Sequence, residues 1–213
     1  MNTIRFNEKN IIPSKVICVG RNYVDHIAEL GNEIPDDMVV FFKPNSSISS
    51  QLHSFHEEPL HYEAELCFLY KKHKKPHNFA EQGYFEAVAI GLDLTKRKLQ
   101  ARLKSKGLPW ERSKAFDGSA VFSEFVEMPS EIDNLSLALS IDGNLIQSGG
   151  VALMMYKPNQ IIAQLSRFIT LEDGDVVMTG TPKGVGEIVK GSSFEGKVNC
   201  GDSVLVSHTW TAI

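Results

Sequence analysis

The sequence predicts an α+β domain built on a rolled or barrel-like mixed sheet with a few peripheral helices. Short apolar or alternating runs separated by turn residues occur along most of the 213-residue chain. Two segments have helical spacing, and they do not alternate regularly with the strands as a doubly wound fold requires. There is no internal repeat, linker or change of composition, so residues 1–213 are expected to form a single domain.

The predicted strands are mostly short: the first ends at a glycine, the second precedes a proline, and the last two follow Gly-Asp turns. They cover residues 14–20, 39–43, 61–70, 135–141, 144–147, 175–179 and 203–207. Asp142-Gly143, between two of these strands, is typical of a tight hairpin.

Two helices are predicted. Residues 22–30 form the first, with Gly31 as its stop signal. Residues 159–170 form the second, and its packed face is expected to carry Ile161, Ile162, Leu165, Phe168 and Ile169.

Composition excludes several classes of function. A formal net charge of −4 gives no global attraction to nucleic acid or to an anionic membrane, and the basic residues 71–77 form one short cluster, expected on an exposed loop. The three cysteines are widely spaced, which favours a reducing compartment. No apolar run approaches membrane-spanning length and no signal-peptide pattern is present, so a cytoplasmic location is expected.

Glu63 and Glu65 are the most informative residues. Along residues 61–70, these two glutamates share one strand face with Cys67 and Leu69. Two carboxylates on one partly buried face repel each other unless a cation lies between them, and Mg²⁺ prefers carboxylate oxygens. Asp93, at the end of an apolar run, offers a third carboxylate. The alternative is that Glu63 and Glu65 form the solvated face of an edge strand.

Three further features are weaker signals. His26 and Glu29 lie three residues apart on the first predicted helix, where a carboxylate can orient an imidazole for activation of water, although such pairs are more often on the surface. Lys114 follows a constrained loop and is able to stabilise developing negative charge. Residues 179–186 (TGTPKGVG) allow backbone N–H groups to approach a ligand, but they match neither the Walker nor the dinucleotide-binding pattern.

Together these motifs resemble the fumarylacetoacetate hydrolase family in order and spacing, from about residue 15 to the C-terminus. The motifs are Cys18-Val-Gly-Arg-Asn-Tyr with His26 and Glu29, Phe42-Lys43-Pro44, Tyr62-Glu63-Ala64-Glu65-Leu66, Gly91-Leu92-Asp93-Leu94-Thr95, Lys106-Gly107-Leu108-Pro109-Trp110, Lys114-Ala115-Phe116-Asp117 and residues 179–186. The chain looks closest to compact members: acylpyruvate hydrolases, fumarylpyruvate hydrolases and relatives that decarboxylate oxaloacetate.

The resemblance implies a mixed β-roll, usually a homodimer, that acts on a small 2-oxo acid with Mg²⁺, or else Mn²⁺. It implies metal ligands at Glu63, Glu65 and Asp93, and a water-activating dyad at His26 and Glu29. It also implies an active-site lysine at Lys114 and substrate contacts at Arg21, Asn22, Lys43, Gln147 and Thr181.

The implied reaction is hydrolysis of a carbon–carbon bond in a 2,4-dioxo acid, either an acylpyruvate or fumarylpyruvate, to pyruvate and a carboxylic acid. The alternatives are decarboxylation of oxaloacetate, and isomerisation or decarboxylation of 2-hydroxy-diene dioates. A binding module without catalysis is disfavoured because binding alone does not require both the carboxylates and the dyad.

The chain departs from the family pattern near the substrate. Ile146 stands where relatives often have Arg, and Lys98 stands where many have Asp. Loss of the arginine removes one partner for a second substrate carboxylate. On that basis short monocarboxylate acylpyruvates are expected to be preferred over fumarylpyruvate.

Overall fold

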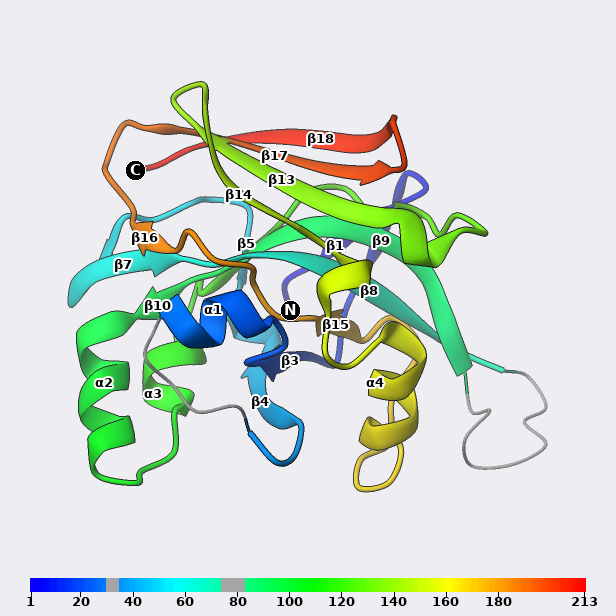
Figure 1. Ribbon diagram of the computed structural model, residues 1–213, viewed down its shortest axis with the longest axis horizontal. Coiled ribbons are helices and arrows are strands. Elements are labelled where there is room, and N and C mark those ends of the chain that lie inside the picture. The colour runs from blue at the N-terminus through cyan, green and yellow to red at the C-terminus, as the bar shows by residue number, and fades with distance from the viewer. Residues whose placement is uncertain (30–34, 74–82) are drawn as a thin grey trace.

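The computed structural model of the chain describes residues 1–29, 35–73 and 83–213 (Figure 1). Gly31, expected to stop the first helix, lies outside the described residues, and so do residues 74–77 of the basic cluster. Lys71 and Lys72, at the start of that cluster, form ion pairs with Asp173 and Glu172. No helix in the described ranges is long and apolar enough to cross a membrane.

The largest sheet is mixed, as predicted. Its strand order is β4-β3-β15-β8-β9-β11-β5, and β12 pairs with β9 beside this path. The strands are β3 (Lys15–Gly20), β4 (Val39–Pro44), β5 (Ile48–Ser49), β8 (Ala64–Lys72), β9 (Gly83–Asp93), β11 (Ala120–Phe122), β12 (Val126–Glu127) and β15 (Val176–Met178). β3 runs parallel to β15 and β5 parallel to β11, while the other pairs are antiparallel.

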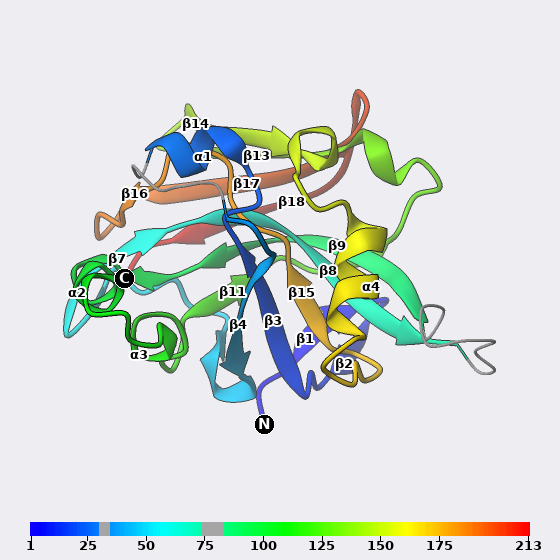
Figure 2. The same cartoon turned by 60° about the horizontal axis from the view of Figure 1, so that its bottom comes forward.

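A second, antiparallel sheet lies across the first (Figures 1 and 2). Its order is β14-β13-β17-β18, from β13 (Leu135–Ile141), β14 (Asn144–Gly150), β17 (Ser193–Cys200) and β18 (Ser203–Thr211). The predicted hairpin joins β13 to β14, and the backbone φ is positive at both Asp142 (48°) and Gly143 (82°), as a tight two-residue turn requires.

Smaller pairings complete the roll. β7 (Glu58–Tyr62) lies between β10 (Thr95–Lys96) and β16 (Gly186–Glu187), and β6 (Phe55–His56) also pairs with it. β1 (Ile4–Phe6) pairs with β2 (Lys9–Ile11). Short 3₁₀ turns cover Asn45–Ser47, Ile132–Asn134 and Val151–Leu153.

The helices are peripheral (Figure 2). They are α1 (Val24–Glu29), α2 (Arg97–Ser105), α3 (Glu111–Lys114) and α4 (Pro158–Leu165). The prediction for residues 159–170 was too long: the helix ends at Leu165, so Phe168 leaves the packed face and is 59% exposed. The sequence interpretation missed α2, and placed Lys114 beyond a loop although it ends α3.

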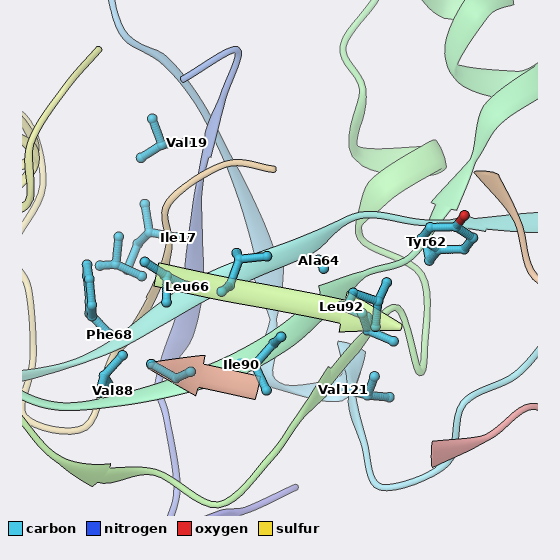
Figure 3. Close-up of a cluster of buried hydrophobic side chains, with 14 of the residues drawn as sticks. Ile17, Val19, Tyr62, Ala64, Leu66, Phe68, Val88, Ile90, Leu92 and Val121 are labelled. Carbon is cyan, nitrogen blue, oxygen red and sulfur yellow. The ribbon is translucent and has the colours of Figure 1, made fainter. Parts of the chain in front are cut away.

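The core places β8 in the interior of the molecule. Leu66 and Phe68 on one face join the cluster drawn in Figure 3, whereas Cys67 and Leu69 on the other face join a second buried cluster. β8 lies between β15 and β9, and both of its faces are covered. The alternative of a solvated edge strand for Glu63 and Glu65 is therefore wrong.

The strand predicted over residues 61–70 is interrupted at Glu63. β7 ends at Tyr62 in the small sheet, and β8 begins at Ala64 in the large one. The chain thus passes from one sheet to the other at a glutamate, and this junction is where the carboxylates gather.

Candidate metal centre and substrate pocket

Three carboxylates meet where β8 begins and β9 ends. The pairing register sets Glu65 opposite Gly91, and the Asp93 N–H donates to the carbonyl oxygen of Glu63 at 2.8 Å. Glu63, Glu65 and Asp93 each offer an oxygen, and these oxygens all lie within 4.8 Å of one another. The three residues are 6%, 2% and 0% exposed. The predicted triad is therefore a buried cluster of like charges.

Lys114 projects from α3 into this cluster. Its Nζ lies 2.8 Å from Glu63 Oε2 and 2.7 Å from Asp93 Oδ2, and it donates to the Thr95 hydroxyl at 2.6 Å. Burial by itself lowers the pKa of Lys114, but the charges of Asp93 and Glu63 outweigh it and raise the pKa above its usual value. The side chain is therefore a protonated donor at neutral pH.

Two other cations contact the carboxylates. Lys43 is fully buried, with its Nζ 2.7 Å from Asp93 Oδ1 and hydrogen-bonded to Ser119. Arg97, from the first turn of α2, forms an ion pair with Glu63. Each of these cations lowers the cost of burying its carboxylate.

Glu65 is held differently. Its Oε2 accepts a hydrogen bond from the Gly180 N–H at 2.7 Å. Burial, followed by the nearby charges of Asp93 and Glu63, raises the pKa of Glu65 well above its usual value. A cation near this oxygen would relieve the repulsion.

These residues fit a divalent ion. The donor set consists of carboxylate oxygens, which suit hard ions such as Mg²⁺ and Mn²⁺. The pKa of Glu65 is raised first by burial and then by the charges of Asp93 and Glu63, and a divalent ion would favour its charged form. Glu63, Glu65 and Asp93 are thus the residues that would hold the ion.

The triad lines a pocket. Its walls come from the end of β3, from α2, from the residues before α3, and from the loop after β15. The lining residues are Val19, Gly20, Arg21, Phe41, Glu63, Glu65, Asp93, Arg97, Gln100, Lys104, Trp110, Lys114, Gly180 and Thr181.

One wall of the pocket is rich in positive charge. Arg21 Cζ and Lys104 Nζ each lie 5.8 Å from the centre of the Trp110 ring, within the range of cation–π attraction. Burial and the charges of Arg21 and Arg97 lower the pKa of Lys104. Four cationic side chains, including Lys114, line the pocket against three carboxylates, so with a divalent ion the site favours an anionic ligand.

The predicted substrate contacts separate into two groups. Arg21 and Thr181 line the pocket. Lys43, Asn22 and Gln147 are buried beside it with partners inside the protein. Asn22 donates to the carbonyl oxygens of Thr179 (2.8 Å) and Tyr156 (3.1 Å), and it accepts from the Tyr156 N–H.

The predicted dyad lies on α1. Glu29 Oε1 accepts a hydrogen bond from the Gly184 N–H at 2.9 Å, which joins this helix to the glycine-rich loop. Asp25 and Lys183 form a second, exposed link at 3.6 Å. The side chain of His26 lies outside the described residues. The role of the dyad stays a prediction.

Sequence reasoning assigned no site to Gln100 or Lys104. Together with Arg97 they lie at positions i, i+3 and i+7 of α2, so one helix face turns toward the pocket. The helical spacing of Leu99 and Leu103 on the buried side was the available signal. Ile146 lies outside the pocket-lining set, and Arg21, Arg97 and Lys104 supply positive charge there instead.

The rolled mixed sheet carries a buried carboxylate triad in a pocket that four cationic side chains also line. Comparison with known protein families identifies the family of the chain. The profile of the family "Fumarylacetoacetate (FAA) hydrolase C-terminal" matches residues 15–210. The chain belongs to the fumarylacetoacetate hydrolase family.

Several curated relatives are more than 35% identical to the chain over the aligned residues. Oxaloacetate tautomerase YcgM of Escherichia coli is 38% identical over 196 residues (85% of this chain, 86% of the relative). The mitochondrial oxaloacetate tautomerase FAHD1 of Arabidopsis thaliana is 39% identical over 189 residues (85% and 84%). A mitochondrial oxaloacetate decarboxylase of Dictyostelium discoideum is 36% identical over 185 residues (83% and 85%).

Solved structures confirm the fold. A candidate fumarylacetoacetate isomerase/hydrolase from Oleispira antarctica superposes with a TM-score of 0.91 at 35% identity, covering 100% of both chains. Fumarylpyruvate hydrolase from Pseudomonas aeruginosa, in complex with Mn²⁺ and pyruvate, gives 0.83 at 27% identity and covers 100% of this chain and 95% of that one. The predicted β-roll is therefore confirmed.

Proposed function

We propose that this chain is a divalent-cation-dependent enzyme that interconverts the keto and enol forms of oxaloacetate, a four-carbon 2-oxo dicarboxylate. The observation that carries the proposal is the placement of Arg21, Arg97 and Lys104 in the pocket that holds the carboxylate triad. The similarity to oxaloacetate tautomerases supports the same substrate. Oxaloacetate is therefore favoured over an acylpyruvate as the substrate.

The two ends of the pocket suit the two ends of such a substrate. A divalent ion on Glu63, Glu65 and Asp93 would act as a Lewis acid toward the carboxylate and 2-oxo oxygens, stabilising negative charge on the latter. The second carboxylate then faces the cationic wall. Burial, and after it the positive charges of Arg21 and Arg97, lower the pKa of Lys104, and a bound dianion would offset the repulsion among these cations.

Tautomerisation moves one proton between C3 and the 2-oxo oxygen, with no change of redox state and no loss of carbon. It requires a base near C3 and a proton donor near the oxygen. Lys114 is the residue that we assign to stabilise negative charge on the 2-oxo oxygen, because its raised pKa keeps it cationic beside the triad. His26, oriented by Glu29, is the base that we assign from the sequence.

Decarboxylation of oxaloacetate is the second candidate. The Dictyostelium relative favours it, and it uses the same stabilisation of charge on the 2-oxo oxygen. It differs from tautomerisation because a carbon–carbon bond breaks and CO₂ leaves. Acylpyruvate hydrolysis additionally requires a positioned water molecule, and it stays a prediction.

The working ion, the assembly and the location are also proposals. Mg²⁺ is the expected ion, and Mn²⁺ is supported by the Pseudomonas structure. A homodimer is what the family resemblance implies, and a cytoplasmic location is the expectation from the sequence.

The test follows enol oxaloacetate by its ultraviolet absorbance and measures pyruvate in parallel with a coupled dehydrogenase. We expect fast, divalent-ion-dependent loss of the enol without stoichiometric pyruvate. Pyruvate formation at the rate of enol loss would instead support decarboxylation. If neither rate exceeds the rate in buffer containing the ion, oxaloacetate is not the substrate.

A further inference from the structure

Gln147 connects the second sheet to the pocket. It lies on β14, is 0% exposed, and reaches the segment that carries the metal ligands. Its Oε1 accepts from the Ala64 N–H at 3.0 Å, and Ala64 lies between Glu63 and Glu65. Its Nε2 donates to the Thr181 hydroxyl and to the Pro182 carbonyl oxygen, both at 2.8 Å.

Two of these partners fix the orientation of the Gln147 amide. The backbone N–H of Ala64 only donates, so the amide oxygen must face it. The carbonyl of Pro182 only accepts, so the NH₂ group must face the loop. The group beside Thr181 Oγ1 is therefore a donor, and the hydroxyl accepts from it.

The hydrogen bond from Gln147 determines whether the Thr181 hydroxyl can donate to a ligand. A hydroxyl has one hydrogen, and accepting from Gln147 leaves that hydrogen unused. Within the described ranges its acceptor is the Pro182 carbonyl at 3.4 Å, which is long for an O–H···O bond. Thr181 lines the pocket beside Gly180, so its O–H can turn toward an anion there.

We propose that Gln147 is a positioning residue, which makes the Thr181 hydroxyl a hydrogen-bond donor to the carboxylate of the bound 2-oxo acid. The inference rests on the proposed function for its class of ligand. It reassigns Gln147 from direct substrate contact to action through Thr181. A hydrogen bond to a charged group is stronger than one between neutral groups, so loss of this polarity weakens carboxylate binding.

The test is a double-mutant cycle on binding of pyruvate to the Mn²⁺-loaded protein, measured by calorimetry. The variants are Gln147→Met, Thr181→Val and the double variant. Gln160→Met on α4, where the side chain bonds to the Lys157 N–H, is the matched control. Affinity for Mn²⁺ alone and thermal unfolding are measured for each protein.

We expect Gln147→Met to weaken pyruvate binding at least about tenfold when Thr181 is present. In the Thr181→Val background the same change should alter the Kd less than twofold. Thr181→Ser, which keeps the hydroxyl, should retain binding within about threefold. Equal weakening in both backgrounds would overturn the proposal, because Gln147 then acts without Thr181. So would unchanged binding in the single variant.

If Gln147→Met does not fold, Gln147→Glu replaces it in the same cycle. It keeps an acceptor for the Ala64 N–H and removes both donors. Repulsion from the new charge affects both Thr181 backgrounds equally, so only a loss that requires the Thr181 hydroxyl supports the proposal. Pyruvate binding involves no turnover, so the result stands even if oxaloacetate is not the substrate.

Discussion

The Nζ of Lys114 lies 2.7 Å from Oδ2 of Asp93, and the two side chains are only 2% and 1% exposed. The ammonium group of Lys114 therefore lies among the carboxylates of Glu63 and Asp93, which would also bind a divalent ion. A bound ion brings two further positive charges to the same carboxylates. Lys114 and the ion thus compete for Asp93 and Glu63.

Lys114→Met should therefore bind Mg²⁺ more tightly, by at least about tenfold, because the repulsion between the ammonium and the ion disappears. Turnover should fall, since the cation that stabilises the negative charge on the 2-oxo oxygen is lost. Calorimetry and oxaloacetate assays on the same samples check both effects. Lys15→Met is the matched control, because Lys15 forms an ion pair with Asp175 (2.5 Å) at the other end of β15. Unchanged or weaker Mg²⁺ binding would contradict competition.

Glu65→Gln tests the metal site itself. The Gln oxygen can still accept from the Gly180 N–H, so the fold should survive. Affinity for Mg²⁺ should fall at least about a hundredfold and turnover should be lost, because one anionic ligand is removed. Glu172→Gln, which removes the surface partner of Lys72, is the control. If the Mg²⁺ affinity of Glu65→Gln equals that of the wild type, Glu65 is not a ligand.

His26→Ala tests the predicted base. Loss of a general base should lower tautomerisation by about a hundredfold or more, and acylpyruvate cleavage likewise if it occurs. Metal affinity should stay nearly unchanged. Decarboxylation should tolerate the change far better, because it needs stabilised charge but no proton acceptor. Asp25→Asn on the same helix is the control. A wild-type tautomerisation rate in His26→Ala would place the base elsewhere.

The triad was predictable because it depends on local spacing. Alternation over residues 61–70 predicts Glu63 and Glu65 on the same side of the chain, and Asp93 ends the apolar run of the neighbouring strand. The break of the strand at Glu63 was not predictable, because alternation looks the same whether a strand stays in one sheet or passes into another. Alternation also left open whether the face that carries Glu65 is buried, and the two buried clusters on either side of β8 show that both faces are.

The surroundings of the triad depend on contacts between distant segments. Gln147 bonds to Ala64, 83 residues away, and Asn22 bonds to Tyr156, 134 residues away. No local pattern encodes such partners, so these residues resembled substrate contacts in the sequence. Lys104 was missed because the helix that carries it was not recognised. Only the helical spacing of seven residues indicates that Lys104 and Arg97 lie on the same face.

Lys104 gives the pocket a testable pH dependence. Its pKa is lowered from 10.5, first by burial and then by the charges of Arg21 and Arg97. The protonated form attracts a carboxylate and the neutral form does not, so dicarboxylate binding should weaken as pH rises through this lowered pKa. Malonate, an unreactive dicarboxylate, should therefore lose affinity for the Mg²⁺-loaded protein as the pH is raised from neutral, and the loss should begin below the ordinary lysine pKa of 10.5.

The matched variant for this effect is Lys104→Met. It should bind malonate several-fold more weakly at neutral pH, and its affinity should change little over the same pH range. Pyruvate, which lacks the second carboxylate, should show a smaller dependence on pH in the wild type because its charge lies at the metal end. Calorimetric titrations of both ligands at several pH values check these expectations. If Lys104→Met retains the pH dependence of the wild type, another group must titrate, and the second carboxylate does not face Lys104.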